Sequence, residues 1–357
     1  MARIKQCKEC GTPLMVSKEN IWYDNGVTAQ AGDFEHRMLF YESDNLNALF
    51  MGIEDIIGIP IAKIIIESKR REVKDYVEKL ISPLKRVAVR HVGIGMMIDT
   101  LSRNGTAFGY GDIGLVDRRR KNDADDFITM SVRNPHSVLF FCGEVLGAWE
   151  VIDGRDHCVS YERLDDGTYH VICRVGEHPI ELQEMLQFRN YSYKKGDIAY
   201  DRCGTCDIPL NVAKCVWDLE QGTIRHPETG RRMSIFGPRG VEAILDDLES
   251  ELGESIPAAV IEAQRRTVRA AMSNMTWLGD EEHYRGMMAF RGLGNMVRME
   301  RSERSISLTM QNACIDLMAV GMAQALFELS AGIDSSRYEY KISPDGDLDI
   351  TITAGQA

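Results

Sequence analysis

The sequence predicts a mixed α/β (α+β) protein in which two homologous α/β modules in tandem form a pseudo-dimer, each with an N-terminal Cys-x-x-Cys segment. The first observation is a repeat: CKECGTPLMV from Cys7 returns as CGTCDIPLNV from Cys203, and ITMSVRN at 128–134 returns as ISLTMQN at 306–312. The second is a hydrophobic period that changes from strict alternation to nearly continuous apolar runs, as expected when strands are followed by a buried helix. An internal repeat is considered before the single elements, because it determines the architecture of the whole chain.

Further matches keep the same order along the chain. IESKRRE from Ile66 corresponds to IEAQRRT from Ile261. Gly143, Glu150 and Gly154 each recur 178 positions later, as Gly321, Glu328 and Gly332. The boundaries that follow are a first repeat at 1–178, a linker at 179–200, and a second repeat at 201–357. The linker contains the polar, turn-prone stretch RNYSYKKGD.

The first elements of each module precede the alternating segment. Short strands are expected around 21–23 and 38–41. Asp44 is placed to cap the helix that follows, because its carboxylate can accept hydrogen bonds from first-turn amides. A second helix should open at Ile59, with Pro60 in the first turn, where its missing N–H costs little. Residues 84–102 carry a third helical pattern.

The remaining elements of the module start with FITMSVR, whose apolar and polar residues alternate like those of a half-buried strand. Residues 137–152 are apolar nearly all round, which indicates a helix buried against a sheet. Two strands, 158–164 and 169–175, should close the unit as a hairpin. In the second copy the strand falls at 306–312, the helix at 313–330, and the hairpin turn at Asp345-Gly346.

Composition and charge exclude several classes of protein. The net charge of -12 disfavours a nucleic-acid-binding protein, which needs a basic surface. No run of about 18 apolar residues is present, so no membrane-spanning helix is expected. The N-terminus lacks the apolar core of a secretion signal, so we expect a cytoplasmic protein. In that compartment the nine cysteines would stay reduced and available to a metal.

The two Cys-x-x-Cys pairs are the candidate metal ligands. Zinc prefers four thiolate or imidazole ligands in a tetrahedron, and neither half has a second cysteine pair at suitable spacing. The simplest arrangement is therefore one zinc shared by the pairs Cys7 and Cys10, and Cys203 and Cys206. Separate sites completed by histidine or carboxylate, a redox dithiol, an iron–sulfur centre and plain buried thiols remain alternatives. Cys215 has no counterpart in the first half.

The C-terminal part of each half resembles the 4-vinyl-reductase domain family, also described as hydrocarbon-binding. The resemblance lies in Asn134-Pro135-His136, in the glycine pair Gly143 and Gly147, and in the turn at Asp166-Gly167. The second half keeps Asn312, Gly321 and Asp345-Gly346, with Ala325 at the position of Gly147. The resemblance implies small α/β domains that bind apolar or aromatic molecules. The zinc site of some members is not carried over, because Cys158 and Cys173 lack its spacing.

The resemblance and the apolar side chains along the buried helix predict ligand pockets. The expected lining residues are His136, Phe140 and Trp149 in the first half and Cys314, Met318 and Phe327 in the second. His136 has an alternative role as a hydrogen-bonding residue at the helix start.

No nucleophile–base pair, paired carboxylates or phosphate loop is recognisable, so no catalytic residue is predicted. The leading interpretation is a non-catalytic small-molecule-binding protein, a sensor or accessory protein, with a structural zinc. A sensor of this kind would need a protein partner, and a homodimer is left open. The alternative is an enzyme or enzyme subunit of reductase type that acts on a vinyl or aromatic group with a cofactor not evident in the sequence.

Overall fold

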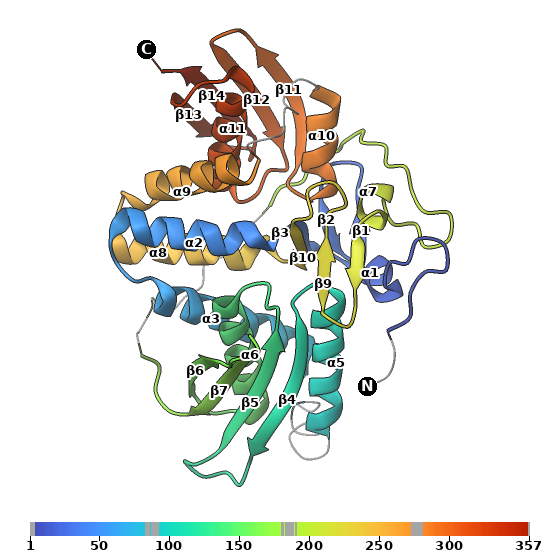
Figure 1. Ribbon diagram of the computed structural model, residues 1–357, viewed down its shortest axis with the longest axis vertical. Helices are drawn as coiled ribbons and strands as arrows, with labels where there is room; N and C mark the ends of the chain where they lie inside the picture. Colours follow the sequence, from blue (N-terminus) through green and yellow to red (C-terminus); the bar gives the residue numbers. More distant parts are fainter. Residues whose placement is uncertain are drawn as a thin grey trace.

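The computed structural model describes residues 4–82, 86, 93–179, 182, 189, 191–272 and 281–355. These residues form a mixed α+β fold with three antiparallel sheets, as the sequence predicts for the fold class (Figure 1). A six-stranded sheet lies at the middle of the molecule, and a four-stranded sheet lies towards each end of its long axis. None of the helices in these ranges is long and apolar enough to cross a membrane.

The central sheet takes three strands from each half of the chain, in the order β1-β2-β3-β10-β9-β8. Its innermost pair, β3 and β10, is antiparallel, with Phe40 opposite Ile235. Both side chains are buried. The strands are β1 (Asn20–Trp22), β2 (Thr28–Gln30), β3 (Asp33–Glu42), β8 (Val216–Asp218), β9 (Thr223–Arg225) and β10 (Arg232–Phe236).

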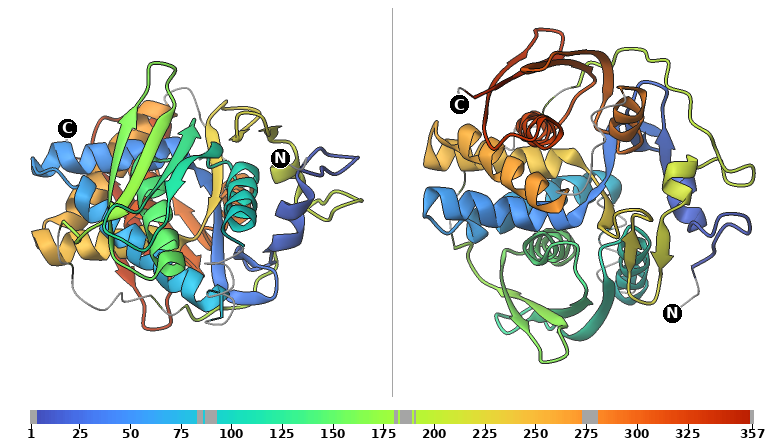
Figure 2. Two further views of the ribbon diagram at one scale, coloured as in Figure 1. Left: turned by 90° about the horizontal axis from the view of Figure 1, so that it is seen from below. Right: turned by 45° about the horizontal axis from the view of Figure 1, so that its top comes forward.

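The two outer sheets have the same strand order. The first is β4-β5-β7-β6 and the second is β11-β12-β14-β13. One long helix packs on each sheet, α6 (Val138–Asp153) on the first and α11 (Asp316–Ala331) on the second (Figure 2). The strands are β4 (Asp112–Arg119), β5 (Phe127–Arg133), β6 (His157–Arg163), β7 (Tyr169–Val175), β11 (Asn295–Arg301), β12 (Ser305–Gln311), β13 (Ser336–Ile342) and β14 (Leu348–Ala354).

Local sequence sets the ends of α6. The Ser137 hydroxyl accepts from the Phe140 N–H, which satisfies one of the exposed first-turn donors. Gly154 ends the helix in the left-handed conformation that glycine adopts without strain. Gly143 and Gly147 face α3 (Ala62–Leu80) so closely that a Cβ at 147 would lie 2.4 Å from a backbone oxygen of α3. The glycine pair therefore allows two helices to pack backbone to backbone.

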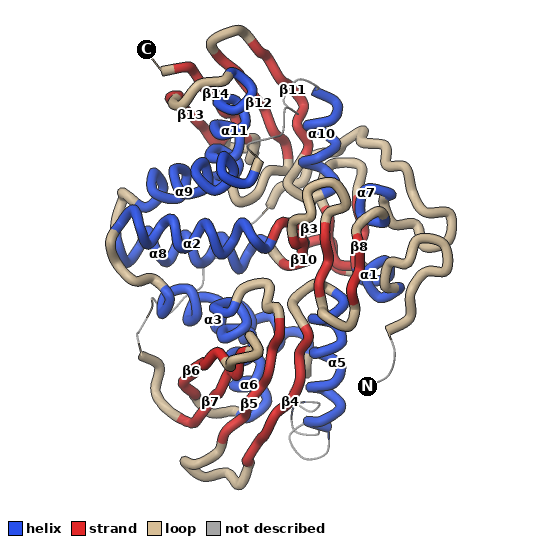
Figure 3. Tube along the Cα trace, viewed as in Figure 1, coloured by secondary structure: helices blue, strands red, loops and turns tan. Residues whose placement is uncertain are grey.

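Four helices fill the space between the outer sheets (Figure 3). They are packed across the two halves of the chain: α2 lies on α9, and α3 lies on α8. Their bounds are α2 (Ser43–Ile57), α3 as above, α8 (Pro238–Leu252) and α9 (Ile256–Ala271). The remaining helices are α1 (Leu14–Glu19), α5 (Ile94–Ala107), α7 (Leu210–Ala213) and α10 (Glu281–Phe290). Much of the helix expected from residue 84 lies outside the described residues.

Two arginines, one in each half, connect the central sheet to the outer sheets. Each arginine lies at a central strand of its own half and bonds the loops beside the outer sheet of the other half. Arg37 at β3 donates to the backbone oxygens of Gly292, Asn312 and Ala313, at 2.6–3.2 Å for its shortest bond to each. Arg232 at β10 donates in the same way to the backbone oxygens of three corresponding first-half residues: Gly109, Asn134 and Pro135. The two halves are thus interlocked by reciprocal contacts.

Glycine loops complete this exchange. The N–H of Gly111 donates to the backbone oxygen of Gly222 at 2.9 Å, and the N–H of Gly294 donates to that of Gly26 at 3.1 Å. A Cβ on Gly222 would lie 2.0 Å from the Gly111 oxygen, so the close approach requires glycine. The glycines of GYGD at 109–112 and GLGN at 292–295 therefore serve turns and backbone contact.

The described part of the segment 179–200 contains no helix or strand. It is nevertheless bonded to both halves. The Lys194 N–H donates to Asn312 Oδ1 at 2.7 Å, and the Ile198 N–H donates to the backbone oxygen of Asp24 at 2.8 Å.

Candidate metal centre and cavity

The two Cys-x-x-Cys segments adopt the same tight turn. The N–H of Gly11 donates to the Cys7 oxygen, and the N–H of Asp207 donates to the Cys203 oxygen, both at 3.0 Å. Gly11 and Asp207 have positive φ angles of 78° and 59°. Glycine and aspartate are residue types that enter this conformation at low cost. Each turn directs its two thiols to the same side.

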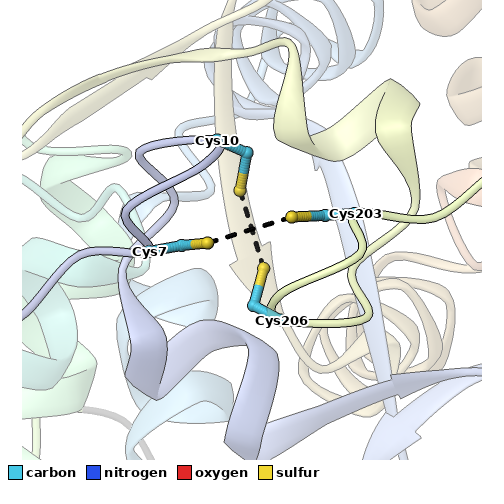
Figure 4. A group of neighbouring side chains, drawn as sticks. All are labelled: Cys7, Cys10, Cys203 and Cys206. Atoms are coloured by element: carbon cyan, nitrogen blue, oxygen red, sulfur yellow. Dashed lines mark hydrogen bonds between the residues drawn. The ribbon is translucent and has the colours of Figure 1, made fainter.

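The structure brings the four predicted ligands together between the two turns (Figure 4). The Sγ atoms of Cys7 and Cys203 are 3.8 Å apart, those of Cys10 and Cys206 are 3.6 Å apart, and all four lie within 4.8 Å of one another. A regular tetrahedron with Zn–S bonds of about 2.3 Å has S···S edges of about 3.8 Å. The cluster is therefore compatible with a metal ion such as zinc.

The surroundings of the cluster stabilise this arrangement. Cys7 and Cys203 are buried, and Cys10 and Cys206 are half-buried. Glu9 extends from the first turn to the second, where it accepts from the Thr205 hydroxyl at 2.6 Å and from the Gly204 N–H at 3.3 Å. Cys215 is also buried nearby, but its thiol donates to the backbone oxygen of Asn211 instead.

The four thiols differ in acidity. The backbone N–H of Cys10 is the main cause that lowers the pKa of Cys7 to about 7. Burial is the main cause that raises the pKa of Cys206. Without a cation the cluster would thus ionise unevenly. A divalent cation at its centre would favour all four thiolates, which couples metal binding to proton release.

A cavity of about 520 Å³ lies in the first half, between α3, α5, α6 and the strands β4 and β5. Ligand sites commonly have volumes of about 300–1,000 Å³. One part of its wall is apolar and aromatic, formed by Met97, Ile98, Ile128, Met130, Phe141, Trp149 and Ile152 among others. The cavity is therefore large enough for a small organic molecule.

The other part of the wall carries charged groups on α3 and α6. Lys69 is buried, and its Nζ lies 2.8 Å from Oε2 of Glu72 and 3.7 Å from Oε1 of Glu144. Burial opposes the charge of this ammonium group, but the two carboxylates outweigh it and raise the pKa of Lys69. Lys69 consequently stays charged at neutral pH, between two acidic side chains on one side of the cavity.

The expected pocket residues of the first half have different positions relative to this cavity. Trp149 forms part of its wall, and its Nε1–H donates to Nε2 of His157 at 3.1 Å. His136 lies behind the wall, stacked on Tyr110 with a centroid distance of 4.1 Å. Phe140 is fully buried and packs on Phe50.

In the second half, Cys314, Met318 and Phe327 are buried in the largest core cluster. The same cluster contains larger side chains at the positions that correspond to the cavity wall. Gly105 and Met288 are at equivalent positions, because their backbone oxygens accept equivalent hydrogen bonds. The donor is the N–H of Tyr110 in the first half and the N–H of Leu293 in the second. On this basis Leu101, Gly105, Glu144 and Ala148 of the cavity correspond to Tyr284, Met288, Met322 and Leu326, all of which are buried. The second half thus has larger, buried side chains at these four positions.

Sequence reasoning missed the polar wall of the cavity, which also includes His36 and Tyr76. A signal was present in the repeat itself. Within the matching segments IESKRRE and IEAQRRT, Lys69 has Gln264 as its counterpart. Just beyond Arg71, Glu72 has Thr267. Charged residues in one copy only are typical of a site present in one copy only.

The first module has a second group of side chains of the kinds that bind metals, namely Glu150, Asp156 and His178. Oε2 of Glu150 is already bonded to Arg70 at 3.0 Å and to Lys74 at 3.2 Å. The corresponding Glu328 is also bonded to two arginines of α9. Paired contacts of this kind in both halves indicate a structural role.

Comparisons of the chain with protein-family models, with curated proteins and with solved structures find no match. The cysteine cluster and the first-half cavity are therefore the features from which a function can be inferred.

Proposed function

We propose that this protein binds a small apolar or aromatic molecule in the first-half cavity, and that duplicated halves arranged as a pseudo-dimer form its scaffold. One observation carries the proposal: the small residues Gly105 and Ala148 line a cavity of about 520 Å³, whereas the larger, buried Met288 and Leu326 stand at the corresponding positions. The resemblance to hydrocarbon-binding domains supports the same class of ligand. The protein would act as a sensor or accessory protein through a partner.

Open space inside a module has a cost. Unfilled core volume lowers the free energy of unfolding, because the surrounding side chains lose contacts. The second module shows that the same arrangement of helices and strands accommodates larger residues. The fold thus does not require the cavity, which is the expected situation when a ligand uses it.

The cysteine cluster has a different part in the proposal. Four thiolates complete a zinc tetrahedron and leave no position for water, so the ion would be structural. It would join the N-terminal turn to the turn at Cys203 and so fix the edges of the central sheet relative to each other.

Thermal-shift and calorimetric titrations with apolar aromatic compounds test the ligand proposal. Saturation at about 100 times the dissociation constant stabilises the folded state by about 2.7 kcal/mol, so a clear rise in melting temperature is expected for compounds that fit. The Ala148→Leu variant should lose the response, because leucine is tolerated at the corresponding position 326. Met96→Leu, at a side chain that is 77% exposed, is the control and should respond like the wild type.

Two outcomes would contradict the proposal. One is the absence of any response from a broad panel of compounds. The other is an equal response from wild type and Ala148→Leu. A redox cofactor that co-purifies with the protein and supports turnover would instead favour the reductase-type alternative.

A further inference from the structure

The ionisable groups around the cavity are mostly acidic. The wall contains the carboxylates of Glu19, Glu72 and Glu144, but Lys69 is its only ammonium group among the described residues. Burial lowers the pKa of His36, so this ring is neutral at neutral pH. The cavity wall therefore contains more acidic than basic side chains.

Lys69 does not offer a free positive charge to a ligand. It is held between two carboxylates, and its ion pairs use Oε2 of Glu72 and Oε1 of Glu144. An anionic ligand that approached Lys69 would meet both carboxylates at close range. The second oxygen of each carboxylate takes no part in these ion pairs, and a carboxylate can accept several hydrogen bonds.

Glu144 retains its charge in this setting. Burial opposes its ionisation, but the neighbouring His136 and Lys69 hold the pKa of Glu144 below its ordinary value. Arg239 of α8 acts electrostatically on His36 and is not among the described residues of the wall.

Aromatic rings surround the same space. The wall includes five of them, namely Tyr76, Phe108, Tyr110, Phe141 and Trp149. Faces of aromatic rings attract organic cations, and the attraction is stronger when water is excluded. Rings together with carboxylates are a chemical combination suited to a protonated amine attached to an apolar body.

The charges and the space coincide in one half of the chain. The positions of Lys69, Glu72 and Glu144 are occupied by Gln264, Thr267 and Met322 in the second half. The module whose core is filled thus also lacks the charged groups.

We propose that the ligand of the first-half cavity is an organic cation, an apolar or aromatic amine whose ammonium group binds Glu144 and Glu72. This inference rests on the proposed small-molecule-binding function and specifies its ligand class. It also predicts one ligand per chain, because the corresponding side chains of the second half are uncharged, and Gln264 and Met322 among them are buried.

A matched set of three probes tests the charge preference: 1-naphthylmethylamine, 1-naphthalenemethanol and 1-naphthoic acid, titrated calorimetrically at pH 7. The amine should bind at least about 10-fold more tightly than the alcohol, since hydrogen bonds between charged groups are stronger than those of a neutral hydroxyl. The acid should bind most weakly, and the stoichiometry should be one amine per chain.

Glu144→Gln and Glu72→Gln should each weaken amine binding about 10-fold and leave alcohol binding nearly unchanged. Glu78→Gln, at an exposed carboxylate on the same helix, is the control and should alter neither. Melting curves establish that each variant is folded, and Glu144→Met, which copies residue 322, replaces Glu144→Gln if the latter is unstable.

The outcomes separate this inference from the function on which it rests. Equal or tighter binding of the alcohol or the acid, abolished by Ala148→Leu, would overturn the cation preference and leave small-molecule binding intact. Amine binding that is insensitive to both glutamate substitutions would also overturn it. Failure of all three probes to bind the wild type would count against the cavity as a ligand site.

Discussion

Replacement of Cys7 or Cys203 by serine should remove one zinc ion per chain and strongly destabilise the fold. The two thiols are 196 residues apart in sequence and 3.8 Å apart in space, so an ion between them closes a very long loop. In the chain-entropy model for a cross-link, a loop of this length restricts the unfolded chain by about 5 kcal/mol. Either substitution opens that loop, and we expect a loss of this order in the free energy of unfolding.

Elemental analysis and urea denaturation of the same preparations measure both effects. Wild-type protein should contain one zinc per chain, and a strong chelator should lower its melting temperature. Cys215→Ala is the matched control. Cys215 is a buried thiol in the same hydrophobic core as Cys7 and Cys203, but it donates to Asn211 and does not belong to the four-cysteine cluster. It should retain its zinc.

Two results would refute this reasoning, and a third would change only the identity of the metal. Two zinc ions per chain, with each substitution removing one, would mean independent sites. Full zinc content in Cys7→Ser would mean that Cys7 is not a ligand. Iron in place of zinc would leave the cluster in place but change its chemistry.

Three further predictions concern the scaffold. Arg37→Met should lower the free energy of unfolding by about 3–5 kcal/mol, because it deprives buried carbonyls of a charged donor. Arg232→Met should lower it less, because water reaches the half-buried side chain of Arg232. Equal losses in urea titrations of the two variants would contradict this. Gly147→Ala should cost about 1–3 kcal/mol through overpacking, and a neutral effect on the melting temperature would mean that α6 and α3 are farther apart. Burial opposes ionisation of Glu42, but Arg291 holds the pKa of Glu42 below its ordinary value. Its stabilising effect is therefore present above an unfolded-state pKa of about 4.3 and lost as the pH falls through the folded-state value. The stability difference between wild type and Glu42→Gln should accordingly shrink between pH 6 and pH 3, and a constant difference would argue against the ion pair.

The elements of the outer modules follow from local sequence. The strand expected at 128–134 is observed at 127–133, and the helix expected at 137–152 is observed at 138–153. The hydrophobic period of these elements, the serine that caps the helix and the glycine that ends it can each be recognised within a few residues of sequence. In the second half the strand is equally close, at 305–311, while the helix expected from 313 begins at 316.

The central sheet could not be predicted in this way. Strands β1 and β2 have three residues each, and β3 pairs with a strand almost 200 residues away. Asp44 illustrates the problem. Its sequence position suggests a helix cap, but its carboxylate accepts from the N–H of Arg232, on β10 of the other half. Contacts of such long range leave no local pattern.

The two candidate sites differ for the same reason. The four cysteines were recognisable because their spacing is repeated. Lys69 and Glu72, by contrast, lie in a highly charged helix whose sequence looks like a solvent-facing surface. The packing of α6 and α8 against α3 turns that side inward.

The interlocked halves also have a consequence for synthesis on the ribosome. Strand β3 must wait for β10, and Cys7 must wait for Cys203, until the intervening residues are translated. At about 5–20 residues per second this delay lasts roughly 10 to 40 s. During that time one edge of β3 is open to pairing with another nascent chain. We therefore expect that neighbouring ribosomes on one mRNA produce some dimers in which two chains have exchanged their halves.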